Sequence, residues 1–206
     1  MRAAGEVRQA RARWAPVPAS RCRIVFKQTL IITVPFAYYD KLSPARQRIY
    51  RKSDAIETLG IPPGLALGRA IAAIADGLLN EHRASAQSAC QSLVNALLEG
   101  YRVPAVRVKV LLRRPADDYG ELHGLYEPEE DGARACITLW MRTAQRKQVV
   151  AFKTFLRTLI HEVCHHLDYE LFALEETFHT EGFYKRESTL VSALLAQLAA
   201  QSEQSL

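Results

Sequence analysis

Residues 161–165 read His161-Glu162-Val163-Cys164-His165, and the segment around them decides the prediction of the fold. Apolar side chains precede and interleave with this stretch at helical spacing, which predicts one long buried helix from about 147 to 169. Four residues span about 40° more than one helical turn, so the two imidazoles project from the same face. Cys164 lies about 100° away from His165 around the axis, and we expect it to face the core. The apolar positions are Phe152, Phe155, Leu156, Leu159, Ile160 and Val163.

Two imidazoles on one helix face can bridge a tetrahedral metal ion, and Glu162 lies beside the first of them. This is the H-E-x-x-H arrangement of zinc peptidases. Zinc acts as a Lewis acid that lowers the pKa of a bound water towards about 7. We expect Glu162 to accept the proton of that water as general base and to pass it to the leaving amine. His161 and His165 are therefore predicted ligands of one Zn²⁺ ion.

A catalytic zinc needs a third protein ligand and one open position. The best candidate is His179, which follows His165 after 13 intervening residues. The alternative is Glu187, 22 positions past His165 and near the start of the last predicted helix. Asp168 shares a face with His161 and is better placed to support a ligand or to end the helix.

Two further side chains near the motif carry weaker expectations. His166 points about 100° away from His165, so we expect it to pack or to support a ligand without binding the metal. Tyr184 is a candidate donor to the oxyanion of a tetrahedral intermediate, with a packing aromatic as the alternative.

The segment from His161 to Phe183 resembles the SprT-like zinc metallopeptidases, a family that includes the Spartan-related DNA–protein crosslink proteases. Their pattern is H-E-x-x-H, a loop of a dozen or so residues, and a third His followed by an aromatic, which here is His179-Thr180-Glu181-Gly182-Phe183. The resemblance covers about residues 86–190. It implies a zincin-like catalytic domain, zinc ligation by His161, His165 and His179, and Glu162 as general base. It also matches a strand at 137–141, expected to be an edge strand that holds an extended substrate.

The remaining pattern predicts an α+β fold with a small, mostly antiparallel three-stranded sheet between N-terminal helices and the helix of the motif. Ser43-Pro44 predicts a helix start that runs to about Leu59, and Gly100 is read as a helix C-cap. Helices are expected at 44–59, 65–80, 84–99, 147–169 and 186–200, and strands at 23–34, 106–112, 121–126 and 135–141, with an acidic turn at 127–132.

Charge divides the chain unevenly. Residues 1–53 contain 12 Lys and Arg against two acidic residues, although the whole chain has a net charge of only +5. We therefore separate a basic arm, residues 1–43, from a domain over 44–206 with a helical part (44–100) and a sheet and site part (101–206). The arm can contact DNA or anionic lipid, or it is a solvated tail.

The cysteines and the apolar segments bear on the compartment. Cys22, Cys90, Cys136 and Cys164 form no C-x-x-C pair, which excludes a cysteine zinc ribbon and favours reduced thiols. The apolar stretch at 29–39 is too short to span a bilayer and lacks a cleavage site, so the prediction is a cytoplasmic protein without membrane attachment.

The sequence thus favours a zinc-dependent metalloendopeptidase that acts on a protein or peptide substrate. The alternative is a nucleic-acid-associated or protein-binding protein with a non-catalytic zinc site. A structural zinc site is normally closed by four protein ligands, whereas this motif offers three and a carboxylate base.

Overall fold

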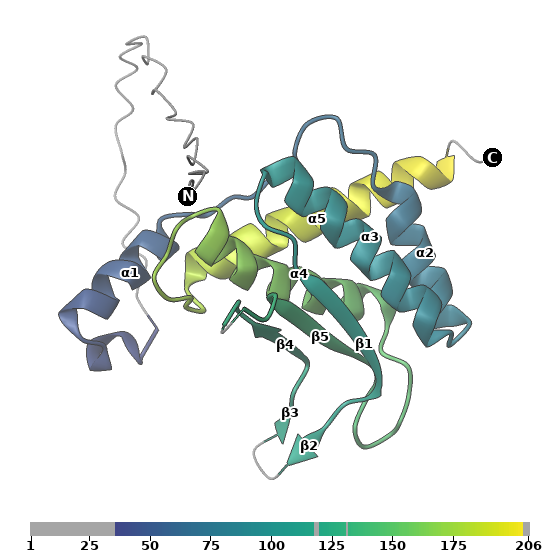
Figure 1. Ribbon diagram of the computed structural model, residues 1–206, viewed down its shortest axis with the longest axis horizontal. Helices are drawn as coiled ribbons and strands as arrows, with labels where there is room; N and C mark the ends of the chain where they lie inside the picture. The colour runs from purple at the N-terminus through teal and green to yellow at the C-terminus, as the bar shows by residue number, and fades with distance from the viewer. Residues whose placement is uncertain (1–35, 118–119, 131, 204–206) are drawn as a thin grey trace, which may run out of the picture. The chain divides into compact units, whose positions relative to one another are not determined.

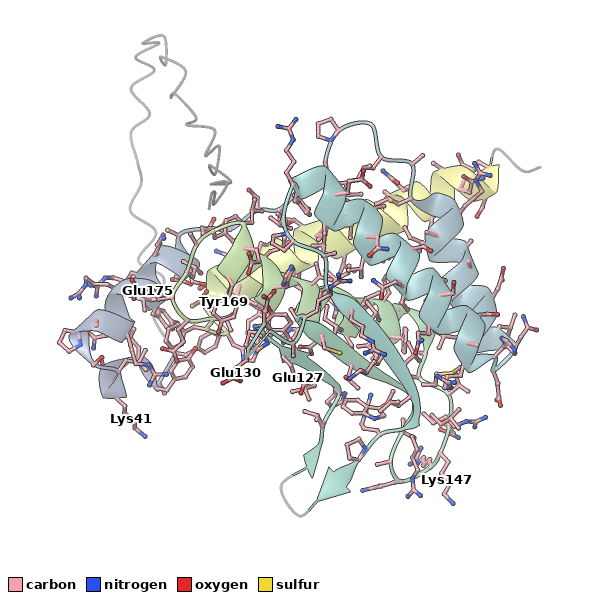
Figure 2. All side chains as sticks on the ribbon, in the orientation of Figure 1. Lys41, Glu127, Glu130, Lys147, Tyr169 and Glu175 are labelled. Carbon is pink, nitrogen blue, oxygen red and sulfur yellow. The ribbon has the colours of Figure 1, made fainter. Side chains whose placement is uncertain are left out.

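The helix that carries the motif is α4 (Phe152–Glu170) in the computed structural model, which describes residues 36–117, 120–130 and 132–203 (Figure 1). It begins five residues later than predicted. The residues before it pair with the sheet instead, because Val149 bridges Arg142 and Val150 N–H donates to Met141 O at 2.7 Å. Lys147, labelled in Figure 2, lies on this connection and has a φ of 54°. A tertiary pairing therefore overrides the local helical pattern.

Three helices precede the sheet, namely α1 (Pro44–Asp54), α2 (Gly68–Leu79) and α3 (Arg83–Tyr101), after the short 3-10 turn η1 (Tyr39–Lys41). The predicted cap of α1 is confirmed, since Ser43 Oγ accepts from Arg46 N–H, but the helix ends before Leu59. The predicted apolar stripes of α2 and α3 are also confirmed as core. Their buried members are Ile71, Ile74, Leu78, Cys90, Leu93, Leu97 and Leu98.

The predicted C-cap of α3 is wrong. Gly100 lies inside the helix, and Arg102 adopts the left-handed conformation with a φ of 60°. Gly100 has a packing role instead: a Cβ there would lie 2.8 Å from Pro62 Cβ. A close approach of two segments, and not a turn, requires glycine at this position.

The main sheet has the order β1-β5-β4, formed by β1 (Arg107–Arg113), β5 (Cys136–Arg142) and β4 (Gly124–Glu127). β4 runs antiparallel to β5, but β1 runs parallel to it. The expected mostly antiparallel sheet is therefore a mixed one. Between β1 and β4 the chain forms a separate two-stranded pair, β2 (Ala116–Asp117) and β3 (Gly120–Glu121). Glu127 is the last residue of β4, and Glu130 lies in the acidic turn that follows; both are labelled in Figure 2.

β5 is the central strand, which contradicts the expectation that residues 137–141 form the substrate-binding edge. Six of its seven residues are buried, as an unbroken apolar run in a central strand requires. The sheet edge beside α4 is β4, because α4 packs against β4 and β5 (Figure 1).

The outer margin of β1 is occupied by side chains of α3. The side-chain amide of Gln91 makes two hydrogen bonds with the backbone at β1: its oxygen accepts from Val108 N–H at 2.8 Å, and its nitrogen donates to Val106 O at 2.9 Å. Gln87 accepts from Val110 N–H at 3.0 Å. These amides stand where a further strand would hydrogen-bond, so this margin is closed to strand addition.

The last helix, α5 (Glu181–Glu203), packs against α2, α4 and α1. It begins five residues earlier than predicted, where Thr180 Oγ1 accepts from Phe183 N–H at 2.9 Å. Phe183 is thereby fixed in the core below the motif. Among the described residues, Cys90, Cys136 and Cys164 are free and buried, as expected.

Two expectations concern residues outside the described ranges. The strand at 23–34 and most of the basic arm at 1–43 lie there, as does Cys22. No helix in the described part of the chain is long and apolar enough to cross a membrane.

Candidate metal centre

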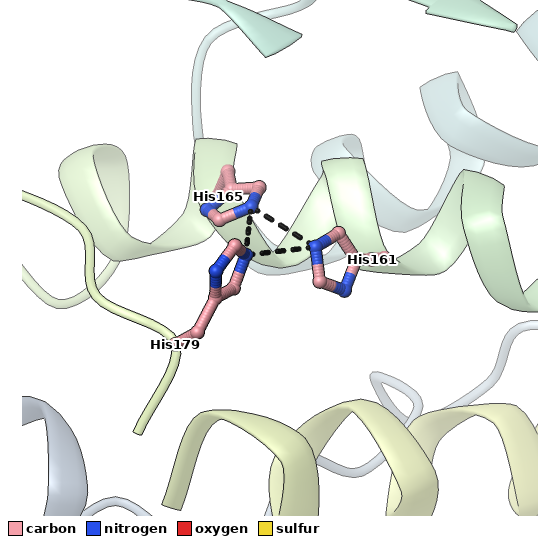
Figure 3. A group of neighbouring side chains, drawn as sticks. All are labelled: His161, His165 and His179. Atoms are coloured by element: carbon pink, nitrogen blue, oxygen red, sulfur yellow. Dashed lines mark hydrogen bonds between the residues drawn. The ribbon is translucent and has the colours of Figure 1, made fainter. Parts of the chain in front are cut away.

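Three histidines converge on one point. His161 and His165 lie one turn apart on α4, and His179 comes from the loop that joins α4 to α5 (Figure 3). The Nε2 atom of His161 lies 3.0 Å from Nε2 of His179 and 3.2 Å from Nε2 of His165, and the third distance is 3.1 Å. Such a cluster can hold a metal ion.

The second nitrogen of each helical histidine has a hydrogen-bonding partner that orients the ring. His161 Nδ1 lies 2.9 Å from a carboxylate oxygen of Glu187, and His165 Nδ1 lies 2.8 Å from Thr177 Oγ1. The carboxylate accepts, so Nδ1 of His161 carries the proton. Thr177 donates its own hydrogen to Asp168, so its oxygen accepts from His165. With Nδ1 of each ring engaged in this way, Nε2 of both rings points into the cluster, where it can bind a metal ion.

Burial keeps two of these rings neutral. It lowers the pKa of His165 to about 3 and also lowers the pKa of His179, with the neighbouring histidines adding to both shifts. A metal ion therefore does not have to displace a proton from either ring at neutral pH.

A buried ion pair fixes the partner of His165. Asp168 accepts from Thr177 Oγ1 at 2.7 Å and from Arg186 Nη2 at 2.6 Å, and the side chains of Asp168 and Arg186 are fully buried. Arg186 also donates to Ser53 O at 2.9 Å, at the end of α1. The expectation that Asp168 supports a ligand thus agrees with its position, and Thr177 is the link between them.

Glu187, the alternative third ligand, lies behind the ring of His161. Its carboxylate contacts Nδ1 of that ring and the Nη1 of Arg157, so it stands on the opposite side from the Nε2 cluster. The structure brings His179, and not Glu187, to the metal-binding side.

Glu162 faces a groove between α4 and β4. It is 6% exposed, and burial raises its pKa to about 7, while a hydrogen bond from the backbone of Tyr126 opposes that shift. Gly124 gives the carboxylate its space, because a Cβ there would lie 2.3 Å from Glu162 Oε1. The groove opens into a cavity of about 590 Å³ that Glu162 lines together with His161 and His179.

Tyr184 stands at the mouth of this cavity. Its ring stacks on that of His179 with the centroids 5.8 Å apart, and burial raises its pKa, so the phenol remains a hydrogen-bond donor. His166 points elsewhere, as expected: its Nε2 lies 2.8 Å from Pro104 O and its Nδ1 lies 3.1 Å from Tyr126 Oη.

The predictions from the sequence did not include Thr177, Arg186 or Gly124. The first two reach their partners through space from a loop and from another helix, and no fixed spacing marks such contacts. Gly124 did carry a signal, since a glycine within a strand pattern often marks a close backbone approach.

Comparison with known proteins yields no matching family model, no matching curated protein and no matching solved structure. The function of the site must therefore follow from its own geometry and chemistry.

Proposed function

We propose that the protein is a zinc-dependent metalloendopeptidase with a SprT-like, zincin-type centre. The observation that carries the proposal is the convergence of three histidine Nε2 atoms beside a buried glutamate that faces a sheet edge. Three protein ligands leave a fourth position open, which is the arrangement of catalytic zinc sites.

The histidine geometry fits zinc. A tetrahedral ion with Zn–N bonds of about 2.0–2.1 Å sets its ligand nitrogens about 3.3–3.4 Å apart. The observed separations of 3.0–3.2 Å are within a few tenths of an ångström of that spacing. Glu187 and the Thr177–Asp168 pair supply the carboxylate support that zinc-binding histidines usually have.

When bound, zinc supplies a Lewis acid that lowers the pKa of water in its open position. Glu162 lines the same cavity as His161 and His179 and, with zinc bound, would accept the proton of the attacking water and deliver it to the leaving amine. Tyr184 lies beside His179 and is a donor to the negative charge that develops on the attacked carbonyl oxygen.

The substrate in this proposal is an extended peptide that adds to the sheet at β4. The backbone of Tyr126 hydrogen-bonds to Glu162, so the outer margin of β4 faces this carboxylate. Strand addition supplies backbone hydrogen bonds regardless of the peptide sequence.

The test compares wild type with Glu162→Gln after zinc loading, using an unfolded protein as substrate. Glu162→Gln should retain one zinc ion and the wild-type fold but lose peptide hydrolysis, because an amide cannot accept the proton. Glu170→Gln is the matched control, since it changes an exposed glutamate of the same helix. If Glu162→Gln cleaved as fast as wild type, or if the zinc-loaded wild type did not cleave at all, the proposal would fail.

A further inference from the structure

The three histidines of the cluster are not equally fixed by local structure. His161 and His165 lie within α4, where the hydrogen bonds of the helix set their positions. His179 lies on the loop 171–180, which contains no helix or strand. Within the described chain, no backbone N–H of residues 175–179 donates to a backbone carbonyl. The position of His179 therefore depends on contacts that reach the loop from elsewhere.

A segment far upstream supplies contacts near both ends of this loop. Residues 36–54 contain η1 and α1, lie beside the loop, and are called the clasp below (Figure 1). Tyr38 Oη donates to the backbone carbonyl of His179 at 2.9 Å. At the other end of the loop, Lys52 Nζ donates to Ala173 O at 3.1 Å. The clasp thus bonds to the backbone of the ligand residue itself.

The clasp also holds the middle of the loop. Arg46 Nε donates to one carboxylate oxygen of Glu176 at 2.7 Å, and its Nη2 donates to the other. The guanidinium carbon of Arg46 lies 5.4 Å from the ring centroid of Phe178, and the ring of Tyr50 lies 6.0 Å from the same ring. Tyr50 and Phe178 are buried. The residue that precedes His179 in sequence is therefore packed against α1.

The clasp is in turn anchored to α5. Asp54 Oδ1 accepts from Gly182 N–H at 2.9 Å, and the two backbones approach closely, since a Cβ on Gly182 would lie 2.1 Å from Asp54 O. Arg186 adds its bond to Ser53 O at 2.9 Å. Because α5 also packs against α4, the clasp and the two helical histidines belong to one packed unit.

We propose that the clasp positions His179 for metal binding, with Tyr38 and Arg46 as the positioning residues. A ligand on a loose loop must be ordered when the metal binds, and this ordering lowers the affinity. Contacts that hold the loop beforehand remove that cost. The inference goes beyond the peptidase function, because it concerns only the metal cluster and makes its affinity depend on a segment outside the H-E-x-x-H motif.

The first experiment measures the zinc dissociation constant of the full chain by competition with a chelator. Tyr38→Phe removes the hydroxyl that bonds to His179 O but keeps the ring that packs on Tyr50. The dissociation constant should rise about 3–10-fold, the contribution of one hydrogen bond. Tyr39→Phe is the matched control, since the hydroxyl of Tyr39 accepts from Arg51 inside the clasp. Its dissociation constant should equal that of wild type.

The second experiment tests the ion pair. Arg46→Gln and Glu176→Gln should each raise the zinc dissociation constant about 2–5-fold, as expected for a partly exposed pair. The double variant should lose little more than Arg46→Gln alone, because both changes break the same contact. Arg48→Gln is the control: Arg48 is exposed on α1 and forms no ion pair with any residue in the described ranges.

Melting temperatures separate positioning from a purely structural role. If the clasp positions His179, the rise in melting temperature on adding a fixed zinc concentration should be smaller in Tyr38→Phe than in Tyr39→Phe, because zinc binds less tightly. A purely structural contact would lower the melting temperature equally with and without zinc and leave the dissociation constant unchanged.

The outcomes distinguish this inference from the proposed function. Zinc dissociation constants equal to that of wild type in both Tyr38→Phe and Arg46→Gln overturn it, whatever the enzymatic activity. A wild type that binds no zinc overturns both proposals. Weaker zinc binding in these variants, together with a zinc-loaded wild type that cleaves no peptide, supports the clasp and overturns the peptidase function alone.

Discussion

Nδ1 of His161 and a carboxylate oxygen of Glu187 lie 2.9 Å apart, on the side of the imidazole ring that faces away from the histidine cluster. The same carboxylate contacts Arg157. Glu187 therefore fixes the tautomer of His161 and directs its Nε2 lone pair to the cluster. Substitutions can therefore distinguish the two candidates for the third ligand, His179 and Glu187.

His179→Ala should abolish stoichiometric zinc binding, because only two of the three clustered nitrogens remain. Glu187→Gln should retain zinc with an affinity about 10–100-fold lower, the usual cost of losing a supporting hydrogen bond. Metal content after gel filtration, followed by titration against a competing chelator, measures both. Equal loss of zinc in the two variants would make Glu187 a ligand.

Thr177→Val should lower zinc affinity about 10–100-fold, because valine keeps the shape of threonine but breaks the link between His165 Nδ1 and Asp168. Thr177→Ser keeps the hydroxyl and should restore the affinity. A purely structural role would instead show the same fall in melting temperature for both variants without a change in zinc affinity.

Gly124→Ala should reduce hydrolysis at least about 100-fold while zinc content stays at one ion. The new Cβ would lie 2.3 Å from Glu162 Oε1 and 2.8 Å from Thr158 Cγ2, so the base must move. The overpacking should also cost about 1–3 kcal/mol of unfolding free energy. Gly60→Ala is the control, since a Cβ there has no atom within 4 Å. Unchanged turnover in Gly124→Ala would show that this contact does not position Glu162.

The metal-free protein should show a pH-dependent stability that depends on Glu162. Burial raises the pKa of Glu162 to about 7 in the folded state, against an ordinary value of 4.5. Between pH 4.5 and pH 7 the carboxyl group of Glu162 is therefore protonated in the folded state and ionised in the unfolded state. Because the folded state binds more protons, the free energy of unfolding falls as the pH rises through this range. Glu162→Gln does not titrate. Its stability relative to metal-free wild type should therefore grow by about 3 kcal/mol over that range.

Urea unfolding of both metal-free proteins at several pH values measures this difference. Bound zinc should reduce it, because a nearby cation favours the carboxylate in the folded state. A difference that stays constant with pH would mean that the pKa of Glu162 is not raised by burial.

Local signals predicted most of the helices and the two histidines that α4 contributes to the cluster. Ser43-Pro44 starts α1, and the H-E-x-x-H spacing places His161 and His165 on one face. His179 could be predicted because it follows H-E-x-x-H after a loop of 13 residues and precedes an aromatic residue, Phe183.

Non-local pairing accounts for what the sequence could not predict. α4 begins later than predicted because Val150 N–H donates a hydrogen bond to Met141 O. The parallel pairing of β1 with β5 could not be predicted either, because strand order depends on the whole chain. Arg186 and Thr177 reach the site from separate elements, so only the folded structure reveals their contacts.

The two margins of the three-stranded sheet are unequal, because the amides of Gln87 and Gln91 occupy the β1 margin and leave the β4 margin facing Glu162. An unfolded chain cannot add as a strand at β1, because the amides of Gln87 and Gln91 already bond the backbone there. Under the proposed function, such a chain would pair with β4, beside Glu162 and the three histidines. Exposed strand edges usually promote self-association, but here the accessible edge coincides with the place where a captured chain would be cut.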